Sequence, residues 1–236
     1  MKLSRYLLPC ASTLLAIAAF VVGAPAFAQS STQRSAANSY TWAGYVAPSA
    51  GTTMVKADWV VASSSSTATP SGDSAWLGIG GYASNDLLQV GTRTLYSASG
   101  TTTMAWYELI PAPAVPIAMR VASGDHIHAQ IKEIGTDSWS IELDDLSTGT
   151  HFATEVSYHS SQSSAEWIIE APRSTSGSLA LDRFSPIAFA NAGYATNGTE
   201  VPFAAHSLLR LLLVDHSLAK IANVSSMKDA AFNISR

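Results

Sequence analysis

The stretch SAEWIIEAP, residues 164–172, reads as a β-strand that contains two glutamates. Because side chains alternate between the two faces of a strand, Trp167 and Ile169 share one face. Glu166 and Glu170 share the other. Carboxylates rarely lie on a packed surface without a partner or a role. The pattern therefore predicts one strand face that packs into a core and an opposite face that carries chemistry.

Similar short runs recur along the chain from Asn38 onward and are separated by Gly, Ser, Pro and Asn. They are rich in β-branched and aromatic residues, as strands are. Helical periodicity is weak, and the only helical turn that we expect is in LALDRFSPIA, residues 179–188. The chain shows no internal repeat and no dividing linker. We therefore predict one all-β domain over residues 38–236, a sandwich of two antiparallel sheets.

The first 28 residues have the features of a secretory signal peptide. A basic start and an apolar run over residues 7–22 precede AFA, residues 26–28, which fits the small-x-small cleavage rule. We expect cleavage after Ala28, a polar tail or short pro-segment over residues 29–37, and a secreted or periplasmic protein. An uncleaved membrane anchor is the alternative. No later apolar stretch reaches the roughly 20 residues of a membrane span, so we expect no membrane association after cleavage.

The composition excludes several kinds of chemistry for the mature chain. The only cysteine, Cys10, lies in the predicted signal peptide, which leaves no disulfide or thiol nucleophile in the mature chain. With 13 Lys and Arg against 17 Asp and Glu and no basic run, the chain does not suggest nucleic-acid binding. His126 and His128 share a strand face, but no third ligand is near them in the sequence. We therefore expect no metal and no cofactor, in a domain large enough to be stable as a monomer.

The remaining candidates for chemistry are carboxylates and an amide on strands, because the usual hydrolase motifs such as G-x-S-x-G and H-E-x-x-H are absent. Besides Glu166 and Glu170, Glu108 lies between aromatic and aliphatic neighbours, and Gln89 is an amide in an apolar run. The common interpretation of each is a solvated outer face. Carboxylates and aromatic residues on strands are also typical of two other functions, a sandwich-fold glycoside hydrolase and a non-catalytic carbohydrate-binding module.

The same segments, in the same order, resemble the glutamic peptidases, the eqolisin family. The likeness covers nearly the whole chain from about Asn38; each motif is weak alone, and the ordered set is specific. The resemblance implies a concanavalin A-like β-sandwich with its active site on a concave sheet face. The segments that carry it are SYTWAGYV (39–46), VKADWVV (55–61), SAWLGIGG (74–81), LLQVGT (87–92), MAWYELIP (104–111), SGDHI (123–127), WSIELDDLSTG (139–149), SSAEWIIEAP (163–172) and AFNIS (231–235).

The resemblance also implies a function, an acid-active endopeptidase that hydrolyses polypeptides with a Gln–Glu pair. By motif, this pair is Gln89 and Glu170. Glu170 would take a proton from the attacking water as general base and return it as general acid, while Gln89 would stabilise the oxyanion. An ordinary Glu pKa of about 4.3 would place the activity of such a base in mildly acidic solution.

Other positions match or depart from the family pattern. Glu166 is expected beside Glu170 in the cleft, as a supporting or substrate-facing residue. Gly80 stands where fungal members have Asp. The matching cleft residues are Trp76, Trp106, Glu108 and Trp42, of which Trp42 is equally consistent with a core position.

The glycoside hydrolase alternative meets a geometric difficulty. Four residues along a regular strand separate the Cα atoms of Glu166 and Glu170 by about 13 Å. Paired glycosidase carboxyls are about 5–9.5 Å apart, and EWIIE contains no glycine that would favour a bulge. The peptidase interpretation is therefore preferred.

Overall fold

The computed structural model describes residues 36–236 with the exception of 67, 69, 175–176 and 204–207. The described residues belong to one compact unit. The expected signal peptide and most of the expected tail lie outside them. Ala37, expected at the end of that tail, instead begins β1 (Ala37–Ser39), which pairs in parallel with β19. Among the described residues, no helix is long and apolar enough to cross a bilayer.

The fold is all-β and consists of two sheets of mainly antiparallel strands, which confirms the predicted class. We call the first the concave sheet; its long strands are antiparallel to their neighbours, and β1 adds to its edge in parallel with β19. Short β15 (Ala180–Leu181) adds to it in parallel beside β5. In spatial order its strands are β8 (Val115–Pro116), β7 (Gly100–Ile110), β6 (Leu87–Ser97), β5 (Ser71–Gly80), β12 (Ser164–Glu170), β2 (Trp42–Pro48) and β19 (Leu209–Val214).

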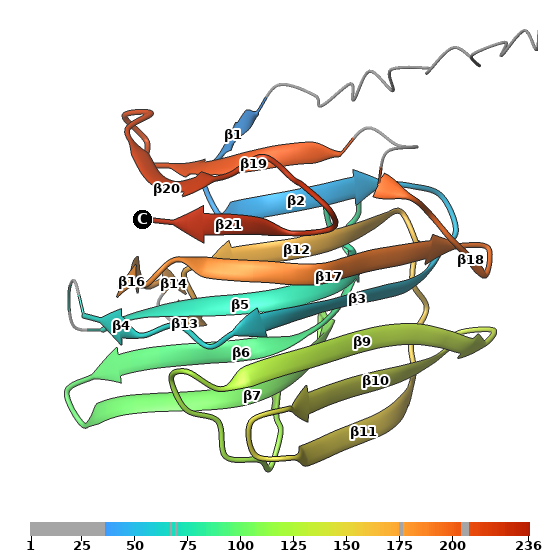
Figure 1. Cartoon of the computed structure of the whole chain (residues 1–236), viewed down its shortest axis with the longest axis horizontal. Helices are drawn as coiled ribbons and strands as arrows, with labels where there is room; N and C mark the ends of the chain where they lie inside the picture. The colour runs from blue at the N-terminus through green and yellow to red at the C-terminus, as the bar shows by residue number, and fades with distance from the viewer. Residues whose placement is uncertain (1–35, 67, 69, 175–176, 204–207) are drawn as a thin grey trace, which may run out of the picture. The chain divides into compact units, whose positions relative to one another are not determined.

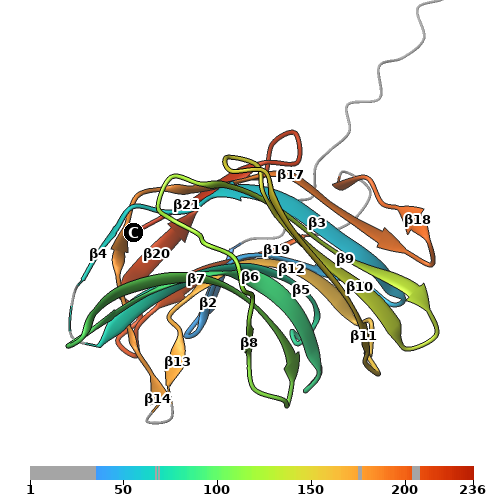
Figure 2. The same cartoon turned by 90° about the horizontal axis from the view of Figure 1, so that it is seen from below.

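The second, outer sheet covers one face of the concave sheet, and the two curved layers are seen edge-on in Figure 2. β20 pairs with a strand of each sheet and so joins them. β18 (Thr199–Glu200) forms a hairpin with β17. In spatial order the outer strands are β11 (Thr150–Ser157), β10 (Ser138–Asp145), β9 (His126–Gly135), β3 (Thr52–Val60), β17 (Ile187–Thr196), β21 (Phe232–Ser235) and β20 (Lys220–Val224), as Figure 1 shows.

Two small strand pairs complete the fold, β4 (Ser64–Ser65) with β16 (Arg183–Phe184) and β13 (Arg173–Ser174) with β14 (Gly177–Ser178). The helical turn expected over residues 179–188 is wrong, because β15, β16 and the start of β17 occupy this stretch. Their backbone groups bond to neighbouring strands, and this pairing outweighs the weak local preference for a turn.

The core lies between the sheets and explains the alternation in β12. Trp167 and Ile169 are fully buried in it, and Trp167 Nε1 donates to the carbonyl of Lys56 in β3 at 3.0 Å. Ile168 points the other way and joins a smaller apolar cluster on the concave face. Burying a side chain of this size stabilises a fold by about 1.5–3 kcal/mol. The predicted two-faced strand is confirmed.

Candidate active site

The concave face holds a cavity of about 800 Å³, within the usual range of ligand sites. Strands β2, β12, β5, β6 and β7 form it, together with residues 110–114 and Arg173. Figure 2 shows β8 and the β13–β14 hairpin projecting from this face. The cavity brings together six of the residues that the sequence singles out: Trp42, Trp76, Gln89, Trp106, Glu108 and Glu170.

The strand register places the two proposed catalytic residues on either side of one tryptophan. Gln89 in β6 pairs with Gly78 of β5, and Glu170 in β12 pairs with Ser74 of β5. Trp76 lies between Gly78 and Ser74 on the same face of β5. A bound substrate that touches both Gln89 and Glu170 therefore passes over Trp76.

The Gln-x-Gly spacing has a steric cause. Gly91 pairs with Trp76 across β5 and β6 and lies on the same face as Gln89. A Cβ atom on Gly91 would lie 2.2 Å from the carbonyl oxygen of Ala75 and 2.6 Å from Cβ of Trp76. Any larger residue at this position would displace Trp76, which meets the indole of Trp42 edge-on at 5.1 Å.

A neighbouring carboxyl orients the amide of Gln89. Nε2 donates to Oε2 of Glu108 at 2.6 Å, across the β6–β7 pair. The side chain of Gln89 is nearly buried, and its Oε1 atom has no hydrogen-bond partner. Nε2 carries a second N–H, so Gln89 keeps one donor and one acceptor for a ligand. The indole N–H of Trp106, in the cavity wall, is likewise buried and unpaired.

The carboxyl of Glu170 is held by Trp42, whose Nε1 atom donates to Oε2 at 2.8 Å. The pKa of Glu170 is raised from 4.5 to about 7, mainly by burial. The hydrogen bond from Trp42 and the charge of Arg173 lower it, and the charge of Glu108 adds to the rise. The sequence-based expectation of an ordinary pKa is therefore wrong. In acidic solution Glu170 is mostly protonated. Because the indole of Trp42 can only donate, Oε2 accepts, and we place the carboxyl proton on Oε1, which leaves the better acceptor at Oε2.

The surroundings of Glu108 also shift its pKa. Burial raises its pKa, and the hydrogen bond from Gln89 and the charges of Arg93 and Arg173 oppose this effect. The cavity thus combines two partly desolvated carboxyl groups with an oriented amide, which is an arrangement suited to moving protons and holding a polarised carbonyl group.

Glu166 does not lie in the cavity, in contrast to the expectation from the sequence. It is fully buried, and burial raises its pKa well above the ordinary value, with opposing contacts from Ser164 and the backbone of Tyr82. Its neighbour in β5 is Gly78. The space where Gly78 would carry a side chain is taken by Leu87 and Trp76, which line the cavity in its place.

Tyr158 supports the site although no sequence motif indicates it. Its hydroxyl accepts from the backbone N–H of Leu87 at 2.8 Å and donates to the carbonyl of Ile110 at 2.6 Å. Tyr158 thereby links β6 to β7. The two bonded residues, Leu87 and Ile110, are each two positions along their strand from Gln89 and Glu108. No local motif marks a contact that spans 48 residues or more of the chain.

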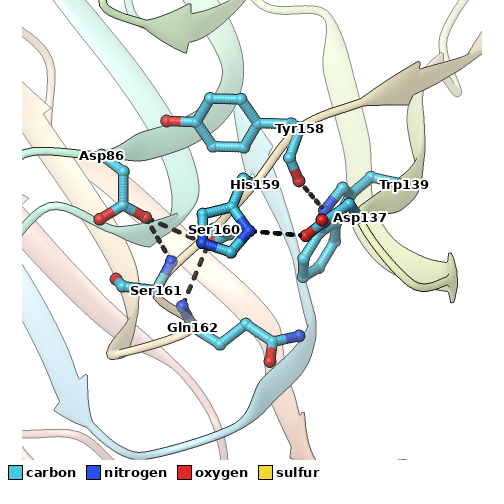
Figure 3. A network of polar contacts seen from close by, with 8 residues as sticks. All are labelled: Asp86, Asp137, Trp139, Tyr158, His159, Ser160, Ser161 and Gln162. Carbon is cyan, nitrogen blue, oxygen red and sulfur yellow. Dashed lines mark hydrogen bonds and ion pairs between the residues drawn. The ribbon is translucent and has the colours of Figure 1, made fainter.

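The segment that follows Tyr158 is itself fixed by polar contacts, which Figure 3 shows. Asp86 accepts from the backbone N–H of Ser161 at 2.6 Å and from the hydroxyl of Ser160 at 3.3 Å. Trp139 Nε1 donates to the carbonyl of Tyr158 at 3.0 Å. The network holds Tyr158 between the start of β6 and the outer sheet.

Asp86 also explains the glycine at position 80. Gly80 has a φ of 84°, a conformation that favours glycine. A Cβ atom there would lie 2.8 Å from the carbonyl oxygen of Asp86 and 3.0 Å from its carboxylate. The space that an Asp would need at this position, as in the fungal pattern, is therefore filled by Asp86.

A buried carboxyl near the site should make stability depend on pH. Burial raises the pKa of Asp73 from 3.8 to about 6; a hydrogen bond from Ser64 opposes this, and Asp182 adds to it. Ionisation is therefore harder in the folded chain than in the unfolded one. This group should therefore contribute about 3 kcal/mol to the free energy of unfolding, a contribution that is fully present below the unfolded pKa of 3.8 and is lost as pH rises through about 6.

Urea unfolding followed by tryptophan fluorescence at a series of pH values would measure this fall. Asp73→Asn keeps an acceptor for the Ser64 hydroxyl, 2.7 Å away, and should flatten the slope. Equal slopes in the two proteins would show that Asp73 does not titrate in this range.

Fold and site together define a β-sandwich protein of the glutamic peptidase class. The model of the Peptidase A4 family matches residues 40–235, so the chain belongs to the Peptidase A4 family. Aspergillopepsin-2 from Aspergillus niger is 31% identical over 134 residues, which are 54% of this chain and 48% of that protein. The match therefore spans about half the length of this relative.

Solved structures of glutamic peptidases have the same fold. Scytalido-glutamic peptidase with a transition state analogue inhibitor matches with a TM-score of 0.73 at 22% identity, over 83% of this chain and 98% of that one. Aspergilloglutamic peptidase from Aspergillus niger matches with a TM-score of 0.61 at 23% identity, over 70% and 98%.

Proposed function

We propose that this protein is an acid-active endopeptidase that hydrolyses polypeptides with Gln89 and Glu170. The observation that carries the proposal is the cavity, in which an oriented amide with a free donor and acceptor shares one space with a carboxyl of raised pKa. Membership in the Peptidase A4 family supports the reaction. The apolar N-terminal stretch with its AFA site supports export to the periplasm or the medium.

In the proposed reaction, Glu170 starts in its protonated form. Oε2 takes a proton from the attacking water while the proton on Oε1 passes to the carbonyl oxygen of the scissile bond. The free N–H of Gln89 donates to that same oxygen as negative charge develops, and Oε1 of Gln89 holds the water. The product of this step is a neutral tetrahedral intermediate.

Its collapse uses the same carboxyl in reverse. The proton on Oε2 of Glu170 passes to the amide nitrogen, and Oε1 takes back the hydroxyl proton. The C–N bond breaks, giving a carboxylic acid and an amine, and Glu170 is again protonated. One carboxyl thus performs each proton transfer, which requires the acid form that a pKa of about 7 provides.

The pH dependence of cleavage tests this proposal. We expect kcat/KM for an unfolded protein substrate to fall with one ionisation as pH rises through about 7, because the protonated carboxyl is then lost. The assay would run from about pH 3 to about pH 9 with pepstatin present to suppress contaminating aspartic peptidases. Tryptophan fluorescence at each pH would report the folded fraction.

Two results would count against the proposal. Activity that rises through pH 7 would mean that the reaction starts from ionised Glu170. If the folded protein cleaves nothing at any pH, the peptidase assignment fails.

A further inference from the structure

A second cavity, of about 310 Å³, adjoins the first at the proposed catalytic carboxyl. The two cavities share Thr41, Glu170 and Arg173 in their walls. The second extends from there towards Tyr40 and strands β15, β19 and β20. A peptide bound with its scissile bond at Glu170 therefore has room for one of its neighbouring groups in this second space. This inference rests on the proposed function.

The wall of the second cavity is largely apolar. Its aliphatic part consists of Leu179, Leu181, Leu213 and Ile221. Such a surface favours the methylene groups of a substrate. At one end lies Arg236, which donates from Nη1 to the carbonyl of Leu181 and whose charge faces that of buried Asp182. Arg236 thus already uses a donor within the protein, although the charge of Arg183 also acts on it.

Arg173 differs from Arg236. Its side chain is exposed and lies in the walls of both cavities. Its backbone pairs with Ser178 of β14, but its guanidinium forms no hydrogen bond or ion pair with the residues that the structure describes. Its charge acts on Glu170 and on Glu108. When Glu170 is protonated, as the proposed reaction requires, its carboxyl carries no charge that would compensate this guanidinium.

We propose that the second cavity is a subsite for a substrate carboxylate, which Arg173 binds while the aliphatic wall contacts the stem that carries it. The carboxylate comes either from an acidic side chain of the substrate or from its C-terminus. A guanidinium is suited to this role because its planar donors match both oxygens of a carboxylate. The enzyme would then prefer acidic sequences near the cleavage site.

A matched set of peptides tests the subsite. In one parent peptide, each position around the scissile bond would in turn be occupied by Glu, Gln or Leu. Every peptide would be made in two forms, with a C-terminal acid and with a C-terminal amide. At about pH 5.5 a substrate Glu is ionised. We expect a preference for Glu over Gln at one position of roughly fivefold to tenfold in kcat/KM, the size typical of a partly exposed charge-assisted contact. If the bound carboxylate is the C-terminus of the substrate, we instead expect a preference of the same size in kcat/KM for the C-terminal acid over the C-terminal amide.

Arg173→Gln should remove this preference, and Arg120→Gln is the matched control. Arg120 is exposed and lies in neither cavity. Loss of the Arg173 charge also shifts the titration of Glu170, which changes the rates of all peptides together. The Glu/Gln ratio cancels that common change and so reports the subsite alone. A salt-dependent decrease of the ratio in the wild type is expected as well.

Binding measurements separate this inference from the proposed function. With Glu170→Gln as background, the dissociation constants of the Glu and Gln peptides would be compared with and without Arg173→Gln. Tighter binding of the carboxylate form that depends on Arg173 supports the subsite even if the wild type cleaves nothing. The inference is overturned, even if the protein is an active peptidase, by equal binding of the Glu and Gln peptides together with equal binding of the C-terminal acids and amides. A carboxylate preference that survives Arg173→Gln overturns it as well.

Discussion

Glu170→Gln is expected to lower kcat/KM for peptide cleavage by about 10²–10⁴-fold, because a carboxamide cannot relay the two protons that the proposed reaction moves. The substitution keeps the size of the side chain. Its carbonyl oxygen can still accept from Trp42 Nε1, which lies 2.8 Å from Oε2 in the wild type. The loss should therefore appear in kcat with a smaller change in KM. Steady-state kinetics on the purified proteins at about pH 5 would measure it.

The same strand provides a matched control, Glu166→Gln. Glu166 lies on the same face of β12, four residues away, but is fully buried and outside the cavity. Burial keeps it protonated in acid, so an amide of equal size should leave kcat/KM unchanged at that pH. If Glu170→Gln retains wild-type activity, or if only Glu166→Gln loses it, the assignment of the catalytic carboxyl is wrong.

The sequence predicted the fold well because each strand carries its own signal. In β12 the period of two places Trp167 and Ile169 in the core and Ile168 on the concave face, as the structure shows. The ordered motifs also led to a common cavity for Gln89 and Glu170, which lie on different strands. Alternation and motif order are properties of the chain itself, and so they are visible without coordinates.

Alternation and motif order do not show which side chains cover a strand face. Periodicity assigned Glu166 and Glu170 to one face, but only Glu170 reaches the cavity. The difference arises from Leu87 and Trp76, which fill the space above Gly78 beside Glu166. The link by Tyr158 likewise depends on packing between distant segments. Long-range packing of this kind decides burial, and burial in turn decides the pKa of each carboxyl.

Gln89→Ala is expected to lower kcat by about 10²–10³-fold, the usual cost of removing one donor to a developing oxyanion. The amide N–H acts most strongly in the transition state, so KM should change little. The variant also removes the acceptor Oε1 that would hold the water. Gln130→Ala is the matched control, since Gln130 lies in β9 of the outer sheet, outside the proposed site. Initial rates at saturating peptide would give kcat for each protein.

The double variant shows whether the two residues act on one substrate group. In the proposed reaction both Gln89 and Glu170 contact the same water and the same carbonyl oxygen. Once Glu170→Gln has removed proton transfer, little catalysis is left for the Gln89 donor to assist. The double variant should then be no slower than the slower single variant, as is usual for residues that act as a unit. Losses that multiply would instead mean that Gln89 and Glu170 act independently, which contradicts a shared site over Trp76.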